Sequence, residues 1–416
     1  MDLLNCYLKN CGINLNQFHL LSGIPETTVR NINKKPFNKW TIEQIDAVAL
    51  STNKDRIKVI NELQLLNDSM YKNKYDFGKF HLENRRYIGS KLKLLNWISE
   101  LMESNVEGSS FFDVFAGTGV VTEKMLKNYD EIIINDFLFS NNVIYNAFFE
   151  NSHFDKNKLI SFEQEFNDIK EFIDDSYFAD NYGGKFFSCS DARKIGEIRE
   201  RIERNKNINE KEKSILLASL IYSADKIANT VGHYDAYRKK QTIKDRFEFN
   251  LIQPLDTTGK SISIYREDSN DLVRKIKADV VFIDPPYNSR QYSRFYHVLE
   301  ELVKWDKPKL EGVAMKPPVE NMSEYCKTTA PKVFDDLIKN INAQYIVVTY
   351  NNTYDSKSSS SRNKITHEQI LYSLNSVGET KVFEKPFQFF NAGKTELKNH
   401  KEYVFITRIT GAHHEK

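Results

Sequence analysis

The sequence predicts an α/β protein: a doubly wound, Rossmann-like sheet that carries a helical insertion and is preceded by a small all-α domain. Two observations predict the sheet. From residue 87 on, short apolar runs alternate with helical patterns, which is typical of parallel sheets covered by helices. One of these runs leads directly into a glycine-containing turn, as strands of nucleotide-binding folds do. Helical periodicity around a tight turn within residues 14–50 predicts the all-α domain.

The composition excludes a membrane protein and a disulfide-stabilised domain. The chain has 416 residues, of which 40% are hydrophobic and 28% charged, and no run approaches the roughly 18 apolar residues of a membrane span. Its four cysteines include no C-x-x-C pair, so neither a disulfide framework nor a zinc ribbon is encoded. Asp2 stands where a signal peptide would carry basic charge. We expect a cytoplasmic protein that binds neither a membrane nor a metal ion.

Residues 14–50 predict three short helices. The first two flank the sequence Ser-Gly-Ile-Pro at 22–25, where glycine permits a tight turn and Pro25 suits the first position of the second helix. A third helix is expected within 40–50. Four apolar residues lie at helical spacing around the turn: Phe18, Leu21, Val29 and Ile32.

This stretch resembles the helix-turn-helix of phage repressors and Xre-like proteins, in which the second helix lies in the major groove of DNA. The resemblance implies DNA contacts from a helix at 26–33, through Thr27, Thr28 and Arg30. A small helical bundle that only packs on the next domain is the alternative interpretation.

Seven apolar runs are the expected strands of the sheet: residues 111–115, 131–135, 261–265, 280–283, 344–349, 380–383 and 403–407. The sheet domain is expected at 87–136 and 261–410. The stretch between these segments, 137–260, is largely polar and helical and too long for a loop, so it should form an inserted subdomain. The helix-turn-helix-like domain would occupy 1–66, and a linker 67–86.

The turn after the first strand predicts a site for a nucleoside. It places Gly117 and Gly119 between a strand and a helical pattern, where glycine allows a ligand to approach the backbone closely. A dinucleotide-binding fingerprint would have a third glycine where this chain has Thr122, which favours a cofactor without phosphates. Asp136 ends the second strand, where a carboxylate can hold a ribose diol.

The run Asp-Pro-Pro-Tyr at 284–287 follows a buried-strand pattern and predicts chemistry on an amine. Two prolines restrict the backbone, so the Asp284 carboxylate and the Pro285 carbonyl are held in one geometry. Such a pair can accept both hydrogens of an exocyclic amine. The amine of adenine is a poor nucleophile because its lone pair is delocalised into the ring, and these hydrogen bonds favour a nitrogen that can attack. Pro286 completes the turn, and Tyr287 would stack on the base.

Together, these segments resemble the D12, or Dam-like, class of N6-adenine DNA methyltransferases over residues 80–407. The resemblance implies an S-adenosylmethionine-dependent methyltransferase sheet, S-adenosylmethionine as cofactor and double-stranded DNA as partner. It implies Asp284, Pro285, Pro286 and Tyr287 as the catalytic motif. It implies these cofactor-binding residues: Tyr87, Lys91, Asp113, Phe115, Gly117, Gly119, Asp136 and Asp268.

Within this set, the resemblance assigns different parts of the cofactor to different residues. Tyr87 and Lys91, in Tyr-Ile-Gly-Ser-Lys, would contact its methionine end, and Asp136 its ribose. Asp268 would contact its adenine, although a solvated acid in an acidic stretch is the alternative.

Two further segments, 224–234 and 288–292, resemble a narrower subgroup that accompanies restriction enzymes and includes FokI-type methyltransferases. The expected role is modification within a restriction-modification system, and a cognate endonuclease as genetic partner is left open. The chain departs from this subgroup at 350–354, where Thr353 and Tyr354 replace the expected Glu-Gly.

An adenine inside a duplex cannot reach a sulfonium methyl, so the base must be flipped into a pocket. Tyr287, with Phe295 or Tyr296, could offset the cost by stacking on it. Transfer then needs one in-line step and no covalent enzyme intermediate, which agrees with the absence of cysteine from the catalytic motif.

Net charge is only +2, so DNA binding must depend on local clusters. The basic stretch 238–246 makes the insertion the candidate target-recognition region. The predicted DNA-binding residues are Thr27, Thr28, Arg30, Arg238, Lys239, Lys240 and Arg290. Two other functions stay open: a helix-turn-helix regulator with an accessory methyltransferase domain, and an RNA N6-adenine methyltransferase.

Overall fold

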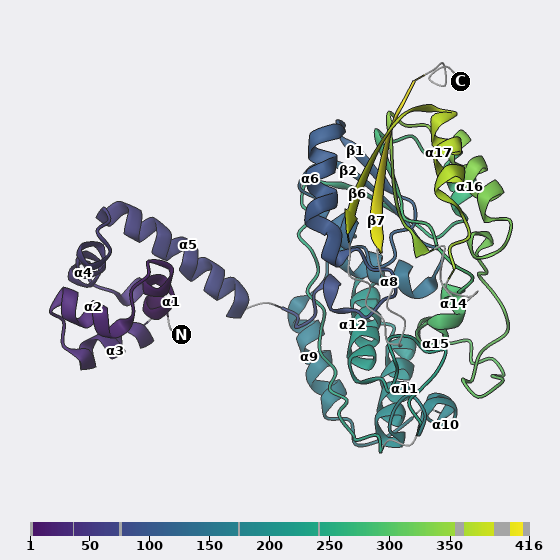
Figure 1. Ribbon diagram of the computed structural model, residues 1–416. Helices are drawn as coiled ribbons and strands as arrows, with labels where there is room; N and C mark the ends of the chain where they lie inside the picture. The colour runs from purple at the N-terminus through teal and green to yellow at the C-terminus, as the bar shows by residue number, and fades with distance from the viewer. Residues whose placement is uncertain are drawn as a thin grey trace. The chain divides into compact units, whose positions relative to one another are not determined.

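The computed structural model describes residues 3–35, 37–74, 77–173, 175–239, 242–353, 362–386 and 400–410. The chain forms two compact units, Met1–Asp76 and Phe77–Lys416. In Figure 1, the described part of the first unit is built of helices, and the second combines a sheet with helices. The predicted α/β fold class is confirmed.

The described residues of the first unit form five α-helices: α1 (Leu3–Asn10), α2 (Leu15–Ser22), α3 (Glu26–Lys34), α4 (Ile42–Thr52) and α5 (Arg56–Lys74). The three predicted helices are present as α2, α3 and α4. Gly23 ends α2 with a left-handed φ of 68°, so the turn depends on glycine there. Phe18, Val29 and Ile32 are buried in the core of this unit, together with side chains of α1 and α5.

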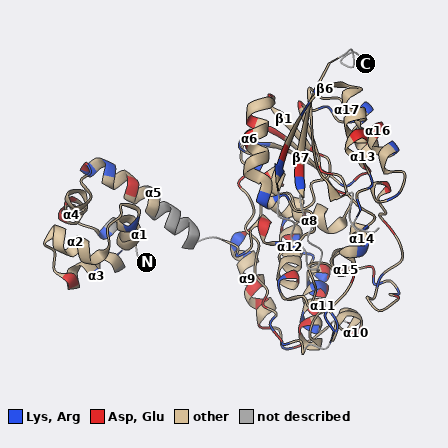
Figure 2. Cartoon of the chain, in the orientation of Figure 1, with Lys and Arg blue, Asp and Glu red and all other residues tan. Residues whose placement is uncertain are grey.

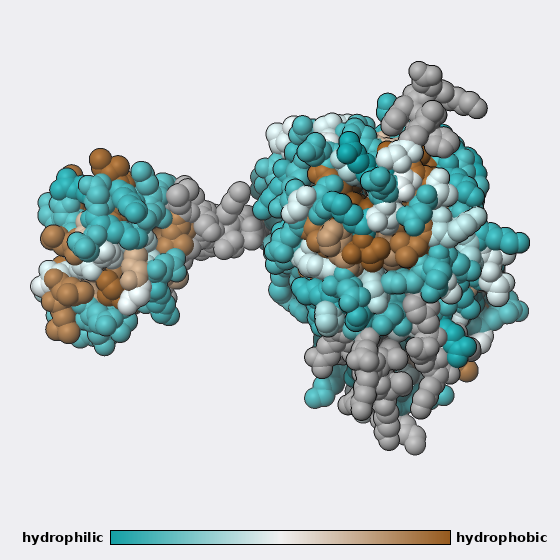
Figure 3. Space-filling model, turned by 45° about the horizontal axis from the view of Figure 1, so that its top comes forward, coloured by the Kyte–Doolittle hydropathy of each residue, from teal (hydrophilic) through white to brown (hydrophobic). Residues whose placement is uncertain are grey.

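Two details of this unit differ from the predictions. Pro25 is the N-cap of α3, with ψ of 141°, and Glu26 is the first helical residue. Leu21 is 62% exposed, because α2 turns only one side, with Phe18, toward the core. Figure 3 shows brown, hydrophobic patches on this unit, whose large exposed apolar side chains are Leu20, Leu21, Ile42, Leu50 and Ile57.

The prediction of a linker at 67–86 is also wrong. Its first part continues α5 to Lys74. Its last part belongs to the second unit, because Phe77, Phe80 and Leu82 are buried in that unit's core. The boundary between the units therefore lies at 76/77.

The second unit is built on a seven-stranded sheet of order β3-β2-β1-β4-β5-β7-β6. The first five strands in this order run parallel, and β7 pairs antiparallel with both β5 and β6. All seven predicted strands are present. Their bounds are β1 (Ser110–Asp113), β2 (Glu131–Asn135), β3 (Ser261–Tyr265), β4 (Val280–Ile283), β5 (Tyr345–Asn351), β6 (Gly378–Pro386) and β7 (Lys401–Ile409).

Helices cover both faces of the sheet because neighbouring residues of each strand point to opposite sides. Phe111 packs on one face with α6 (Leu95–Asn105), α7 (Val120–Met125) and α8 (Phe139–Phe148). Phe112 packs on the other face with α13 (Ser269–Leu272), α16 (Ala330–Lys339) and α17 (His367–Asn375). The remaining short elements are 3-10 helices η1 (Phe37–Lys39), η2 (Leu82–Asn84), η3 (Leu92–Leu94) and η4 (Glu324–Cys326).

The stretch predicted as an insertion, 137–260, is helical as expected but shares its core with the sheet. After α8 it forms α9 (Lys156–Asn167), α10 (Tyr177–Tyr182), α11 (Cys189–Arg204) and α12 (Glu210–Ile227), followed by irregular chain. Phe148 of α8 and Ile221 of α12 belong to the same cluster of buried side chains as Phe111 and Ile132 of the sheet. The inserted helices are therefore continuous with the core of the second unit.

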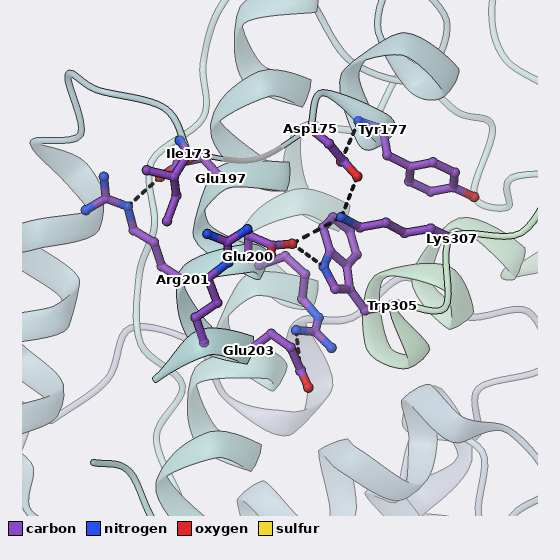
Figure 4. Close-up of polar contacts among 11 residues, drawn as sticks. Ile173, Asp175, Tyr177, Glu197, Glu200, Arg201, Glu203, Trp305 and Lys307 are labelled. Atoms are coloured by element: carbon purple, nitrogen blue, oxygen red, sulfur yellow. Dashed lines mark hydrogen bonds and ion pairs between the residues drawn. The ribbon is translucent and has the colours of Figure 1, made fainter. Parts of the chain in front are cut away.

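Helix α11 also holds the chain that follows the Asp-Pro-Pro-Tyr segment. This chain forms α14 (Tyr292–Phe295) and α15 (His297–Lys304). Arg199, 1% exposed, donates to the carbonyls of Leu302 and Val303 and so caps the end of α15. Figure 4 shows the neighbouring contacts, in which Glu200 accepts hydrogen bonds from Trp305 Nε1 at 2.8 Å and Lys307 Nζ at 3.2 Å.

Charge is mixed over the described surface. Figure 2 shows Lys and Arg interspersed with Asp and Glu along the helices of both units. In the part of the chain that the structure describes, no helix combines the length and apolar character needed to cross a membrane. The same residues contain no group of three or more His, Cys, Asp or Glu side chains arranged to hold a metal ion.

Candidate active site

A pocket opens at the carboxyl ends of the parallel strands, where open α/β sheets bind ligands. All the residues predicted to form the site line it except Gly119: Tyr87, Lys91, Asp113, Phe115, Gly117, Asp136, Asp268, Asp284, Pro285, Pro286 and Tyr287. Segments that are far apart in the sequence therefore meet in one cavity.

The glycine-containing turn forms one wall of the pocket. Gly117 has a left-handed φ of 53°, and its N–H donates to Asp136 Oδ2 at 3.0 Å. Asp136 Oδ1 accepts from the N–H of Leu138 at 2.9 Å, and burial raises the pKa of this carboxyl. Gly119 belongs to the same turn but does not line the pocket. It is the N-cap of α7 with a left-handed φ of 78°, and a Cβ atom there would lie 3.2 Å from the Phe149 ring, so the position favours glycine.

Asp113 is the residue of this wall that could bind a cationic group of a ligand. Its Oδ2 accepts from Thr122 Oγ1 at 2.7 Å, so the residue that breaks the dinucleotide fingerprint holds this carboxylate instead. Its Oδ1 is buried and has no hydrogen-bond partner among the described residues. Burial raises the pKa of Asp113 to about 7. A donor such as the ammonium group of S-adenosylmethionine would satisfy the orphaned oxygen.

Asp268 lies in the wall of the pocket. It caps α13 by accepting from the N–H of Asn270 at 2.9 Å. Tyr325 donates to Asn270 Oδ1 at 2.8 Å, and its ring lies 5.0 Å from that of Phe115, edge to face. Phe115 and Tyr325 both line the pocket and offer apolar faces to a planar ligand.

Tyr87 is fixed by aromatic stacking. Its ring lies 4.8 Å from that of Tyr296, at 6°, and 5.3 Å from that of Tyr292. Tyr296 is fully buried, and its hydroxyl accepts from the N–H of Ile88 at 2.8 Å. The expectation that Tyr296 could stack on a flipped base is therefore wrong, since Tyr87 already covers its ring.

The Asp284 carboxylate accepts three hydrogen bonds from side chains of the second unit. Lys91 Nζ lies 2.6 Å from Asp284 Oδ2 and 2.5 Å from the Tyr287 hydroxyl. Tyr287 donates to Asp284 Oδ1, and Thr349 Oγ1 donates to the same oxygen at 2.8 Å. Burial raises the pKa of Tyr287 well above its usual value, so its hydroxyl stays protonated and donates.

The end of β5 packs against the Asp-Pro-Pro-Tyr segment, although the sequence departs from the expected pattern just beyond it. The Tyr350 ring lies 4.8 Å from that of Tyr287, edge to face, and its hydroxyl donates to the Tyr287 carbonyl at 3.4 Å. Of the five residues of that pattern, 350–354, Tyr354 lies outside the described residues.

The predicted DNA-binding residues are divided between the two units. Thr27, Thr28 and Arg30 are exposed on α3 of the first unit, where Arg30 pairs with Glu26 at 2.6 Å. In the second unit, Arg238 and Lys239 are exposed, whereas Lys240 lies outside the described residues.

Arg290 comes three residues after Tyr287 in the sequence, and its guanidinium lies beside a pair of stacked rings. Its guanidinium lies 5.8 Å from the centre of the Phe295 ring, and the His233 ring stacks on Phe295 at 4.5 Å. This stack connects His233 with Arg290 and Phe295, which both follow Tyr287 in the sequence.

Sequence reasoning missed Tyr325 and Thr349. Thr349 had a detectable signal, because it is a polar residue at the end of an otherwise apolar strand run, Tyr-Ile-Val-Val-Thr. Tyr325 had none, since it follows an irregular stretch and belongs to no motif.

Comparison with known proteins agrees with this geometry. The family model for the D12 class of N6 adenine-specific DNA methyltransferases matches residues 87–358, more than half of the chain. The type II methyltransferase M.FokI of Planomicrobium okeanokoites is 33% identical over 346 residues, which cover 77% of this chain and 52% of that protein. The type II methyltransferase M.NlaIII of Neisseria lactamica is 32% identical over 342 residues, 78% of this chain and 99% of that protein.

The modification methylase StsI of Streptococcus sanguinis is 37% identical over 289 residues, which cover 64% of this chain and 44% of StsI. The chain thus spans about half the length of M.FokI and StsI, and matches nearly all of M.NlaIII. Since the matched region contains both the glycine turn and the Asp-Pro-Pro-Tyr motif of the pocket, the chain belongs to the D12 class of N6 adenine-specific DNA methyltransferases.

Proposed function

We propose that this protein is a site-specific DNA adenine N6-methyltransferase that uses S-adenosylmethionine and acts as the modification enzyme of a restriction-modification system. The observation that carries the proposal is the position of Asp284 and Pro285 in the same pocket as Asp113, Asp136 and Asp268. Groups suited to an amine and groups suited to a nucleoside cofactor therefore line one cavity.

The cofactor would be held by four kinds of contact. Asp136 would accept hydrogen bonds from the ribose hydroxyls, and the orphaned Oδ1 of Asp113 would accept from the ammonium group. The adenine ring would lie against Phe115 and Tyr325, with Asp268 at its edge. When bound, S-adenosylmethionine would supply an electrophilic methyl group: the amine nitrogen would bond to the methyl carbon as the carbon–sulfur bond breaks with its electron pair on sulfur, and the methylated amine would then release one proton to solvent.

The residues of the catalytic motif would prepare the target amine. The base would be flipped out of the duplex, since N6 is otherwise out of reach. The Asp284 carboxylate and the Pro285 carbonyl would accept the two N–H bonds, which favours a nitrogen whose lone pair is directed at the methyl group. Tyr287 would stack on the base while its hydroxyl holds Asp284. Positioning in a preorganised polar site supplies most of the acceleration.

DNA binding would use separate parts of the chain. Arg238, Lys239 and Arg290 would contact DNA phosphates, with salt-dependent affinity. The region 137–260 would read the target sequence, and α3 of the first unit would contact DNA through Thr27, Thr28 and Arg30.

Two further features concern the setting of the reaction. The four cysteines are unpaired, which supports a reducing compartment, the cytoplasm. The relatives named as type II methyltransferases and modification methylases support a cognate restriction endonuclease as genetic partner.

Expression in a methylation-free bacterial host tests the proposal. We expect single-molecule sequencing to show N6-methyladenine in one short sequence motif for the wild type and none for Asp284→Ala. Calorimetry should show that Asp284→Ala keeps its S-adenosylmethionine affinity within about tenfold. Unmodified DNA, from wild-type protein that binds S-adenosylmethionine, would contradict the proposal.

A further inference from the structure

The two oxygens of the Asp284 carboxylate have different hydrogen-bonding capacity left. A carboxylate oxygen has two lone-pair positions. Oδ1 accepts from Tyr287 and from Thr349, so both of its positions are taken. Oδ2 accepts from Lys91, which leaves one position unused by these three donors. Oδ2 is therefore the oxygen that can accept an N–H of a target amine without displacing a hydroxyl donor.

Thr349 lies beside Asp284 because of the register between β4 and β5. β4 and β5 are parallel neighbours with Ile283 opposite Val348, so Asp284 and Thr349 are the next residues at the same sheet edge. Thr349 is 2% exposed and does not line the pocket. A buried hydroxyl needs a hydrogen-bond partner, and the Asp284 carboxylate is the partner of this one.

We propose that Thr349 is a positioning residue for methyl transfer: its hydroxyl occupies Asp284 Oδ1 and orients the carboxylate so that Oδ2 faces the amine. The proposal rests on the proposed function, and it names a residue that acts through Asp284 without touching either substrate. The terminal torsion of an aspartate is broad, so the carboxylate depends on its donors for orientation.

Comparison of Thr349→Val with Thr349→Ser tests this role. Valine keeps the shape but removes the hydroxyl, and we expect kcat to fall about 10- to 100-fold. The KM values for S-adenosylmethionine and DNA should stay within about twofold, because Thr349 touches neither. Serine restores the hydroxyl and should bring kcat back to within about threefold of the wild type.

Thr407→Val is the matched control. Thr407 is a fully buried threonine of the same sheet, and its hydroxyl pairs with that of Thr380 at 3.0 Å, remote from the Asp284 hydrogen bonds. This variant should keep wild-type kcat. A Thr349→Val enzyme with wild-type kcat, or an equal loss for both valine variants, would overturn the proposal.

Two results separate this proposal from the proposed function. A wild type that binds S-adenosylmethionine but methylates no adenine would overturn both. An active wild type with an equally active Thr349→Val would overturn only the role of Thr349. If Thr349→Val does not fold, Thr349→Ser and Thr349→Ala are compared instead, and equal kcat for these two would overturn the role as well.

Discussion

Lys91 and Asp284 form an ion pair with 2.6 Å between Nζ and Oδ2, although they lie 193 positions apart in the sequence. The Lys91 ammonium also donates to the Tyr287 hydroxyl and, at 3.2 Å, to the carbonyl of Gly89, so all three of its N–H groups have acceptors. Only 5% of the lysine side chain is exposed. The lysine predicted for the cofactor therefore also contacts two residues of the predicted catalytic motif, Asp284 and Tyr287, directly.

We expect Lys91→Met to lower kcat by at least about tenfold and to weaken S-adenosylmethionine binding as well. Methionine has a similar length but cannot donate, so Asp284 would lose its cation and keep only hydroxyl donors. Truncating one partner of a buried pair also costs about 3–5 kcal/mol of stability. Steady-state methylation and thermal unfolding measure the two effects. Lys93→Met, at an exposed lysine nearby, is the control, and a Lys91→Met enzyme indistinguishable from it would refute this role.

The Asp113 carboxyl should make stability depend on pH. Burial raises its pKa from 3.8 to about 7, so the folded protein keeps a proton that the unfolded chain has already released. The free energy of unfolding that the protonated Asp113 carboxyl contributes is fully present below about pH 4. It is lost as the pH rises to about 7, at up to about 1.4 kcal/mol per pH unit. Asp113→Asn cannot ionise, so it should gain stability relative to the wild type over this range while binding S-adenosylmethionine more weakly. Urea unfolding between pH 5 and 8 measures the difference, and a constant difference would contradict the prediction.

The strands were predictable because each is a short apolar run bounded by turn residues, as at 131–135 and 280–283. The position of β7 between β5 and β6 was not, because it depends on pairing between segments that local patterns do not encode. The false linker at 67–86 has a similar cause. Whether Phe77 and Leu82 are exposed or buried is decided by a core contributed from elsewhere in the chain.

The pocket was predictable to the extent that its residues come from motifs. Asp284 and Gly117 stand at strand ends, and parallel strands bring such ends together. The partners of these residues were not predictable, since Thr349 reaches Asp284 only through the register of β4 with β5. Tyr296 was assigned wrongly for the same reason: its ring is covered by Tyr87, which lies about 200 residues earlier in the chain.

Arg199 should be important for stability although it lies outside the pocket. We expect Arg199→Met to destabilise the second unit by about 2–4 kcal/mol, because the carbonyls of Leu302 and Val303 would lose their buried donor. Thermal unfolding of the full chain measures this loss. Arg204→Met, on the same helix at a side chain 59% exposed, should change stability by less than about 0.5 kcal/mol. Equal effects of the two substitutions would contradict the proposed cap of α15.

The exposed face of α3 should contribute to DNA affinity without affecting methyl transfer. Arg30 is 71% exposed and Thr27 and Thr28 are exposed beside it, so these side chains can be removed without disturbing the core of the first unit. If Arg30 contacts a phosphate, Arg30→Ala should weaken DNA binding and lower the slope of log affinity against log salt by about 1. Adding Thr27→Ala and Thr28→Ala should then reduce discrimination between sequences if these side chains read bases.

Lys58→Ala removes an exposed cation from a different helix of the same unit and serves as control. Identical salt slopes for Arg30→Ala and Lys58→Ala would favour a helical bundle that does not bind DNA, because a bundle without a DNA-facing helix has no reason to distinguish these two charges.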